Sequence, residues 1–189
     1  VLWLPRERRR RVLILGLGGG SVARIARALA PAAEIVGIEL DREVVRLARA
    51  HLGLDDLGIQ VEVADALGWL ESASAKKYGR FDAILEDVFI GHGDEVHKPD
   101  WIPEPAHRLA RKRLAAGGVL VSNTLDEHLE IAREMRRGFD DVVSIEVEDY
   151  DNRVLVAGSG GLTGAALRRR VAASDVLRDS LPILRFRTR

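Results

Sequence analysis

Short apolar runs alternate along the chain with longer segments of helical periodicity, and this alternation constrains the fold more than any other feature of the sequence. The apolar runs predict strands at 12–15, 34–39, 59–63 and 81–86. The periodic segments predict helices at 21–30, 42–51 and 67–75. Strands separated by helices at this spacing run parallel in one sheet with helices on both faces.

The second half of the chain continues this pattern and then departs from it. After a polar loop at 88–103, the sequence predicts a helix at 104–114, a strand at 119–122 and a helix at 126–137. The β-rich segments 142–147 and 153–157 are joined by turn-forming residues, which predicts an antiparallel hairpin. We therefore expect an α/β fold with a doubly wound, mostly parallel seven-stranded sheet that ends in this hairpin. A dinucleotide-binding fold, whose strands remain parallel, differs in that respect.

The charges divide the chain into three parts. Residues 1–11 carry five Arg and one Glu, and residues 165–189 carry seven Arg and two Asp, so the acidic excess lies between them because the total charge is zero. We expect a basic N-terminal segment at 1–11, an α/β domain at 12–158 and a Gly/Arg-rich tail at 159–189. The tail should hold a helix near 165–173 and otherwise pack loosely. The basic ends could contact an anionic partner, but they lack the aromatic residues of a base-stacking surface, so we favour arginines packed on the acidic body.

Composition excludes several classes of protein. The absence of cysteine removes disulfide frameworks, thiolate zinc sites and cysteine nucleophiles. The longest uncharged run, at 154–167, is too short to span a membrane. The apolar residues 12–17 lead directly into three glycines without a cleavage pattern, so we expect no signal peptide and a cytoplasmic location.

A glycine-rich turn follows the first strand and opens the first helix. Gly16, Gly18 and Gly20 lie at the carboxyl end of that strand, where open α/β sheets bind ligands. Glycine allows a ligand to approach the backbone and allows positive φ, although the segment could also be a plain turn. Ser21 occupies the place of the last glycine in a dinucleotide fingerprint, and no Gly-Lys-Ser/Thr follows, so a triphosphate loop is excluded.

Two carboxylates end the next two strands. Glu39 lies about twenty residues past the glycines, where a carboxylate can accept hydrogen bonds from both hydroxyls of a ribose. Asp65 could accept from an exocyclic adenine amine or could cap the following helix, and Asp41 is expected to be an N-cap. Together with the glycines, Glu39 and Asp65 outline an adenosine-shaped site.

With the glycine turn and the two strand-end carboxylates, the chain resembles a known family. Over residues 12–124 it resembles the class I S-adenosylmethionine-dependent methyltransferase fold, and within it the spermidine synthase family and its methyltransferase-like relatives. The residues that carry this resemblance are VLILGLGGGS at 12–21, IELD at 38–41, VADA at 63–66, FDAILED at 81–87 and LAAGGV at 114–119. The resemblance implies that the cofactor, S-adenosylmethionine or its decarboxylated form, contacts Gly16, Leu17, Gly18, Gly20, Glu39, Leu40, Asp65, Ala66 and Asp87.

The fourth strand ends in Glu86 and Asp87, facing the place that the transferable group would occupy. Asp87 matches the first acid of the Asp-Ser-x-Asp-Pro type of segment of aminopropyltransferases, whereas the second acid and its proline are missing. Only 11 residues precede Val12, so the β-domain that those enzymes place there is not expected. We expect Asp87, helped by Glu86 or His92, to orient or deprotonate the acceptor.

The loop at 91–103 lies where such enzymes receive the acceptor. His92, Asp94 and His97 could be metal ligands, but a loop without a paired framework is more often a mobile lid, so we expect no metal. Trp101 and Ile102 could stack on the acceptor or anchor the lid.

The sequence therefore predicts an S-adenosylmethionine-dependent methyltransferase of spermidine synthase-like type that acts on a small molecule, with an amine preferred on electrostatic grounds. The alternatives are an aminopropyltransferase that uses decarboxylated S-adenosylmethionine and a non-catalytic nucleoside-binding or interaction module. A nicotinamide-dependent oxidoreductase is a more distant alternative. We expect neither nucleic acid nor membrane as a partner, and a homodimer stays open.

Overall fold

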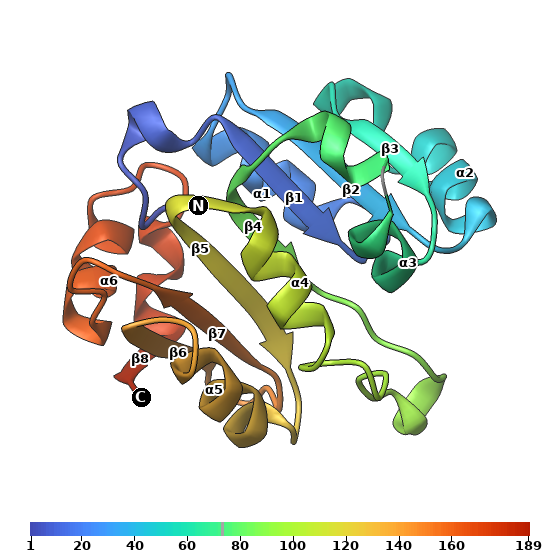
Figure 1. Ribbon diagram of the computed structural model, residues 1–189. Coiled ribbons are helices and arrows are strands. Elements are labelled where there is room, and N and C mark those ends of the chain that lie inside the picture. The colour runs from blue at the N-terminus through green and yellow to red at the C-terminus, as the bar shows by residue number, and fades with distance from the viewer. Residues whose placement is uncertain (73) are drawn as a thin grey trace.

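The computed structural model describes residues 1–72 and 74–189 and contains one sheet flanked by helices (Figure 1). Eight strands form the sheet in the order β3-β2-β1-β4-β5-β7-β6-β8. Their bounds are β1 Arg11–Leu15, β2 Glu34–Glu39, β3 Gln60–Val63, β4 Phe81–Glu86, β5 Leu114–Thr124, β6 Asp141–Val147, β7 Arg153–Gly158 and β8 Leu184–Thr188. The chain order reverses between β1 and β4, which is where sheets of this kind bind ligands.

The first five strands pair in parallel, whereas all pairings of β6, β7 and β8 are antiparallel. β1 pairs with β2 and β4, β2 with β3, and β4 with β5, all in parallel. β7 pairs antiparallel with both β5 and β6. The predicted α/β class, its parallel core and its final hairpin are thus confirmed.

The sheet has eight strands rather than the seven expected, because residues 184–188 form β8 along the outer edge of β6. Phe186 lies opposite Ile145 and packs in the adjacent apolar cluster. Arg187 and Arg189 reach Glu146 across the same strand pair, at 3.6 and 2.8 Å. The expected loose tail is therefore wrong at this point, because its arginines alternate with apolar residues and find acidic partners on β6.

In the described residues, α-helices cover the two faces of the sheet (Figure 1): α1 Ser21–Leu29, α2 Arg42–His51, α3 Ala66–Glu71, α4 Ala106–Arg113, α5 His128–Arg136 and α6 Gly164–Ala172. Val12 and Ile14 of β1 pack with residues of α1 and α2. Leu13 and Leu15 of the same strand pack with residues of α3, α4 and α5 on the opposite face. β1 is therefore buried on both sides, as expected for a central parallel strand.

Most predicted boundaries agree with the structure, and two differ. The helix predicted at 67–75 ends at Glu71 in α3; residue 73, within that prediction, lies outside the described residues. β5 begins at Leu114, earlier than the predicted strand at 119–122, since the pair Phe81–Leu114 continues its ladder past the glycines after an irregularity in register. Among the described residues, none of the helices has the length and apolar content needed to cross a bilayer.

Candidate functional site

A cavity of about 630 Å³ opens at the carboxyl ends of the parallel strands. Its walls come from the glycine turn after β1, the ends of β2 and β3, and the segment that follows β4. The lining residues are Gly16, Leu17, Gly18, Gly19, Ser21, Val22, Ile38, Glu39, Leu40, Asp41, Ala64, Asp65, Ala66, Asp87, Val88, Phe89, Ile90, Gly91, His92 and Trp101. Nearly every residue proposed from the sequence therefore lies around one cavity, with Gly20 and Glu86 outside its lining.

The glycine turn has a backbone that other residues would strain. Gly16 has a φ of 80°, and a Cβ there would lie 2.5 Å from the carbonyl oxygen of Asp87. Gly18 has a φ of 52°, and a Cβ there would meet no atom within 4 Å. Gly20, with a φ of 86°, precedes the first residue of α1. Gly16 thus permits a close backbone approach, whereas Gly18 leaves space on the cavity side of the turn.

Glu39 is held in place by two backbone N–H groups. Its Oε2 accepts a hydrogen bond from the Gly18 nitrogen at 2.8 Å, and its Oε1 accepts one from the Asp41 nitrogen at 3.0 Å. Each carboxylate oxygen keeps a further lone pair for a ligand. The sequence related Glu39 to the glycine turn only through their separation of about twenty residues. The hydrogen bond from Gly18 to Glu39 shows that the two are in direct contact.

The two aspartates near Glu39 both cap helices. Asp41 accepts a hydrogen bond from the Glu43 nitrogen at 2.7 Å, which confirms its expected N-cap role for α2. Asp65 accepts one from the Gly68 nitrogen at 2.7 Å and is the N-cap of α3. Asp65 is exposed and also lines the cavity, so its capping role leaves one carboxylate oxygen facing solvent.

The apolar residues of this side differ in exposure. Leu17 is buried and packs against the place where a Cβ of Gly37 would lie, and Ala66 is buried at the start of α3. Leu40 is 65% exposed at the rim. The cavity lining on this side therefore includes two buried apolar residues and one exposed apolar residue, Leu40.

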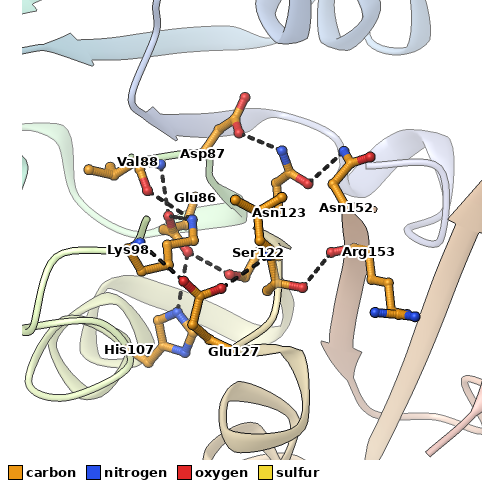
Figure 2. A network of polar contacts seen from close by, with 12 residues as sticks. Glu86, Asp87, Val88, Lys98, His107, Ser122, Asn123, Glu127, Asn152 and Arg153 are labelled. Atoms are coloured by element: carbon orange, nitrogen blue, oxygen red, sulfur yellow. Dashed lines mark hydrogen bonds and ion pairs between the residues drawn. The ribbon is translucent and has the colours of Figure 1, made fainter. Parts of the chain in front are cut away.

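Asp87 forms the opposite wall. Its side chain is half-buried, and its Oδ1 accepts a hydrogen bond from Asn123 Nδ2 at 2.9 Å (Figure 2). Burial raises the pKa of Asp87 above its usual value, although the Asn123 hydrogen bond and the Lys98 charge act in the opposite direction. A raised pKa suits a carboxylate that accepts a proton near neutral pH.

Glu86 lies elsewhere than expected, because it is absent from the cavity lining and only 2% exposed. Its carboxylate accepts hydrogen bonds from Lys98 Nζ at 2.6 Å, from Ser122 Oγ at 2.5 Å and from the Val88 nitrogen at 2.8 Å (Figure 2). Burial acts to raise the pKa of Glu86, but the His107 imidazole and the Lys98 ammonium outweigh it and hold the pKa below its usual value. The geometry makes Glu86 a buried anchor rather than a lining residue.

Lys98 is the main residue that sequence reasoning missed. Its side chain is 2% exposed, and besides Glu86 it donates to the Val88 carbonyl at 2.9 Å and lies 3.8 Å from the centre of the Phe89 ring. His107 lies beside the same carboxylate, with Nε2 3.6 Å from Glu86, beyond hydrogen-bond distance. The only sequence signal was a lysine twelve residues past an acidic strand end, in a segment whose composition is typical of a solvated loop.

Hydrogen bonds hold the segment 88–103 in place, because Lys98 is bound to Glu86 and Val88. Ile90 and His97 form an isolated antiparallel bridge with N–H···O distances of 2.9 and 3.0 Å, which corrects the expected lack of a paired framework. Ile102 is buried in the core, whereas Trp101 lines the cavity. The exposed His92 also lines it. The side chain of Asp94, from the metal-ligand alternative, lies outside the described side chains.

The charge of the cavity is strongly one-sided. Four carboxylates line it, from Glu39, Asp41, Asp65 and Asp87. Among the described residues, its lining includes neither lysine nor arginine, and His92 is its one basic side chain. Such a cavity attracts cations and disfavours a ligand carboxylate.

The strand order, the glycine turn and the acid at the end of β2 together define the fold class of the chain. The chain has the class I S-adenosylmethionine-dependent methyltransferase fold, with the extra edge strand β8. That fold is shared by spermidine synthases and methyltransferases among solved structures.

The similar proteins fall into two groups. In sequence, the chain is 34% identical over 118 residues to a polyamine aminopropyltransferase from Mycobacterium tuberculosis, covering 59% of this chain and 22% of that one. In structure, it matches human methyltransferase-like protein 13 in complex with SAH, with a TM-score of 0.72, 20% identity and coverage of 96% and 84%. It also matches a probable spermidine synthase from Corynebacterium glutamicum, with a TM-score of 0.71, 22% identity and coverage of 94% and 66%.

These similarities have a defined extent. No protein-family profile matches the chain. The chain spans between 22% and 40% of the length of eight curated relatives, each of which carries a polyamine aminopropyltransferase name. The structural matches at 20% and 22% identity concern the fold.

Proposed function

We propose that the chain is a transferase that moves an aminopropyl group from decarboxylated S-adenosylmethionine to an amine acceptor. The observation that carries this proposal is the acidic cavity, which holds four carboxylates without a lysine or arginine in the described lining. Decarboxylated S-adenosylmethionine is a dication, whereas the intact cofactor has a carboxylate that needs a partner. The sequence alone favours methyl transfer, whereas the names of the relatives and this charge distribution support the aminopropyl alternative better.

The residues present fit an adenosyl sulfonium cofactor. Glu39 would hold the ribose hydroxyls, since both of its oxygens are oriented by backbone N–H groups and keep a lone pair. Asp65 and Ala66 would hold the adenine, and the open side of Gly18 would accommodate the chain that bears the sulfonium. The Gly18 N–H, which could have bound a ligand carboxylate, already donates to Glu39. The site is therefore better suited to a cofactor without a carboxylate.

Asp87 would supply the acid–base chemistry. Its carboxylate would orient the acceptor amine and accept the proton that the nitrogen loses as the new N–C bond forms and the C–S bond of the cofactor breaks. The sulfonium charge disappears in that step, so the chemistry itself needs mainly positioning of the two reactants. His92 lies at the same cavity and could contact the acceptor, whereas Glu86 would act only through the wall that it anchors.

Methyl transfer from intact S-adenosylmethionine is the second candidate. The segment after β4 reads Asp87-Val88-Phe89-Ile90-Gly91 and lacks the second acid of the aminopropyltransferase segment. That difference removes one carboxylate that would bind a polyamine. The cytoplasmic location and the homodimer stay predictions.

Product analysis separates the two reactions. The protein is incubated with either cofactor form and a panel of di- and polyamines, and the nucleoside product is identified by mass spectrometry. Aminopropyl transfer yields methylthioadenosine and an acceptor enlarged by an aminopropyl group, whereas methyl transfer yields S-adenosylhomocysteine and a methylated acceptor. Methylthioadenosine formation that requires the amine is the expected result; formation of S-adenosylhomocysteine alone would overturn the proposal.

A further inference from the structure

Two side-chain amides, joined by a hydrogen bond, link the ends of β4, β5 and β7, and the second amide donates to Asp87 (Figure 2). Asn152, which immediately precedes β7, donates from Nδ2 to Oδ1 of Asn123 at 3.1 Å. Asn123, the second-last residue of β5, donates from Nδ2 to Oδ1 of Asp87 at 2.9 Å. We propose that this amide relay positions the Asp87 carboxylate and sets the pH at which that carboxylate accepts a proton. The inference rests on the proposed function, since it assumes that Asp87 serves the acceptor.

The relay has a direction that its geometry enforces. An asparagine amide has one donor end and one acceptor end. Because the ionised carboxylate of Asp87 can only accept, the Asn123 nitrogen must face it, and the Asn123 oxygen is left to accept from Nδ2 of Asn152. The reverse orientation would place the amide oxygen of Asn123 against the carboxylate and two NH₂ groups against each other. Asp87 thus sets which end of Asn123 reaches the site, and the hydrogen bond from Asn152 stabilises the same orientation.

This arrangement leaves Asp87 with two unequal oxygens. Oδ1 is bound by Asn123, whereas Oδ2 has no hydrogen-bond partner among the described residues. Asp87 lines the cavity, so Oδ2 is the atom left for an acceptor. A hydrogen bond to one oxygen also fixes the side-chain torsion and therefore the direction of the other.

Other charged groups surround Asp87 and act on the same proton. Lys98 lies beneath it and favours the carboxylate, whereas neighbouring Glu86 and burial oppose it. His92 and Glu39 line the same cavity from the following loop and from β2. None of these charged groups donates a hydrogen bond to the Asp87 carboxylate among the described residues, whereas the neutral Asn123 does, and such a donor stabilises the ionised form.

Asn123 could instead serve only to join strands, and a neighbouring residue provides the matched control. Thr124 follows it in β5, is fully buried, and donates from Oγ1 to the carbonyl of Arg153 at 2.7 Å. Thr124→Val therefore removes a side-chain link between β5 and β7 without touching Asp87. Thr124→Val and a variant that truncates Asn123 should both lose stability, so stability cannot distinguish a positioning role from a purely structural one. The dependence of kcat on pH can distinguish them.

The test compares Asn123→Ala, Asn152→Ala and Thr124→Val. For Asn123→Ala, the acidic limb of the kcat profile should move upward by about one pH unit, a tenfold change in the proton affinity of Asp87. Asn152→Ala should give a smaller shift in the same direction, and it keeps the relay testable if Asn123→Ala does not fold. Thr124→Val should keep the wild-type profile. Active Asn123 and Asn152 variants with an unshifted profile would overturn the inference.

A second readout separates this inference from the proposed function. The pKa of Asp87 can be followed by carboxyl ¹³C NMR in the full chain, with Asp87→Asn used to assign the signal. A wild-type protein without turnover on any amine would refute the proposed function alone. An Asp87 pKa that stays the same in Asn123→Ala would refute the relay, whatever the protein catalyses.

Discussion

The two sides of the cavity are held by different kinds of contact. On the β1–β3 side, which comprises the glycine turn, Glu39 and Asp65, acidic side chains accept hydrogen bonds from backbone N–H groups. On the β4–β5 side, which comprises Asp87, Glu86, Lys98 and Asn123, buried and half-buried side chains bind one another across 12 to 36 residues of sequence.

This difference has an energetic consequence. Contacts of an acid with backbone N–H groups survive most changes elsewhere in the chain, since the backbone groups are supplied by the turn or helix itself. A buried ion pair is stable only while both partners are present, and loss of one leaves an uncompensated charge. We therefore expect the β1–β3 side to be robust and specialised for binding, and the β4–β5 side to be sensitive and specialised for chemistry.

The largest expected effect is on the stability of the β4–β5 side. Lys98→Met would leave Glu86 buried without its cation, which costs about 3–5 kcal/mol and should lower Tm by about 6 °C or more. Thermal unfolding followed by circular dichroism measures this change.

Two further variants show whether the charge is the cause. Arg46→Gln removes an exposed ion pair with Glu43 and should leave Tm nearly unchanged. Adding Glu86→Gln to Lys98→Met removes the unpaired charge and should restore part of the lost stability. If the double variant is less stable than Lys98→Met, the ion pair is not the reason for the loss.

The second effect concerns catalysis. Asp87→Asn keeps the shape of the side chain and its hydrogen bond from Asn123 but removes the base, so kcat should fall by about 100-fold or more. Cofactor affinity, measured by calorimetry, should change by less than about threefold. An equal loss of affinity and kcat would mean that Asp87 belongs to the cofactor side.

The third effect is the reverse pattern on the β1–β3 side. Glu39→Gln has one acceptor oxygen instead of two and no charge, so cofactor affinity should fall by about tenfold or more. With saturating cofactor, kcat should stay near that of the wild type. Unchanged cofactor binding in this variant would contradict the ribose assignment.

The smallest effect is a gain in stability. Because the pKa of Asp87 is raised by folding, the folded state binds the proton more tightly, and its stability decreases as pH rises through the unfolded pKa to the folded one. Asp87→Asn removes this cost, so Tm at pH 7 should rise slightly, by about 1–2 °C, with no gain at pH 3. A Tm decrease at pH 7 would show that the carboxylate stabilises the fold.

The contrast between the two sides also explains what could be predicted from the sequence. Gly16, Gly18, Glu39 and Asp65 each sit at the end of a strand within a local pattern, so their convergence follows from a parallel sheet. Asp87 was predicted for the same reason, because it directly follows β4.

Lys98 and Asn123 could not be found in this way. Lys98 lies in a polar loop, and its burial depends on the position of Glu86 in the folded sheet. Asn123 depends on the pairing of β5 with β7, a register that strand patterns alone do not determine. Glu86 was misplaced because successive strand residues point to opposite faces, and the end of β4 was read as if both acids faced the cavity. The strand β8 was missed because it is only five residues long and its arginines were interpreted as part of a loosely packed basic tail.

The most direct test of the account is calorimetric titration of the wild-type protein with S-adenosylmethionine and its decarboxylated form in one buffer. The acidic lining predicts that the decarboxylated form binds more tightly, by about tenfold or more, and that added salt narrows the difference. Tighter binding of the intact form would contradict the central claim and restore methyl transfer as the leading function. Binding of neither form would support a non-catalytic module.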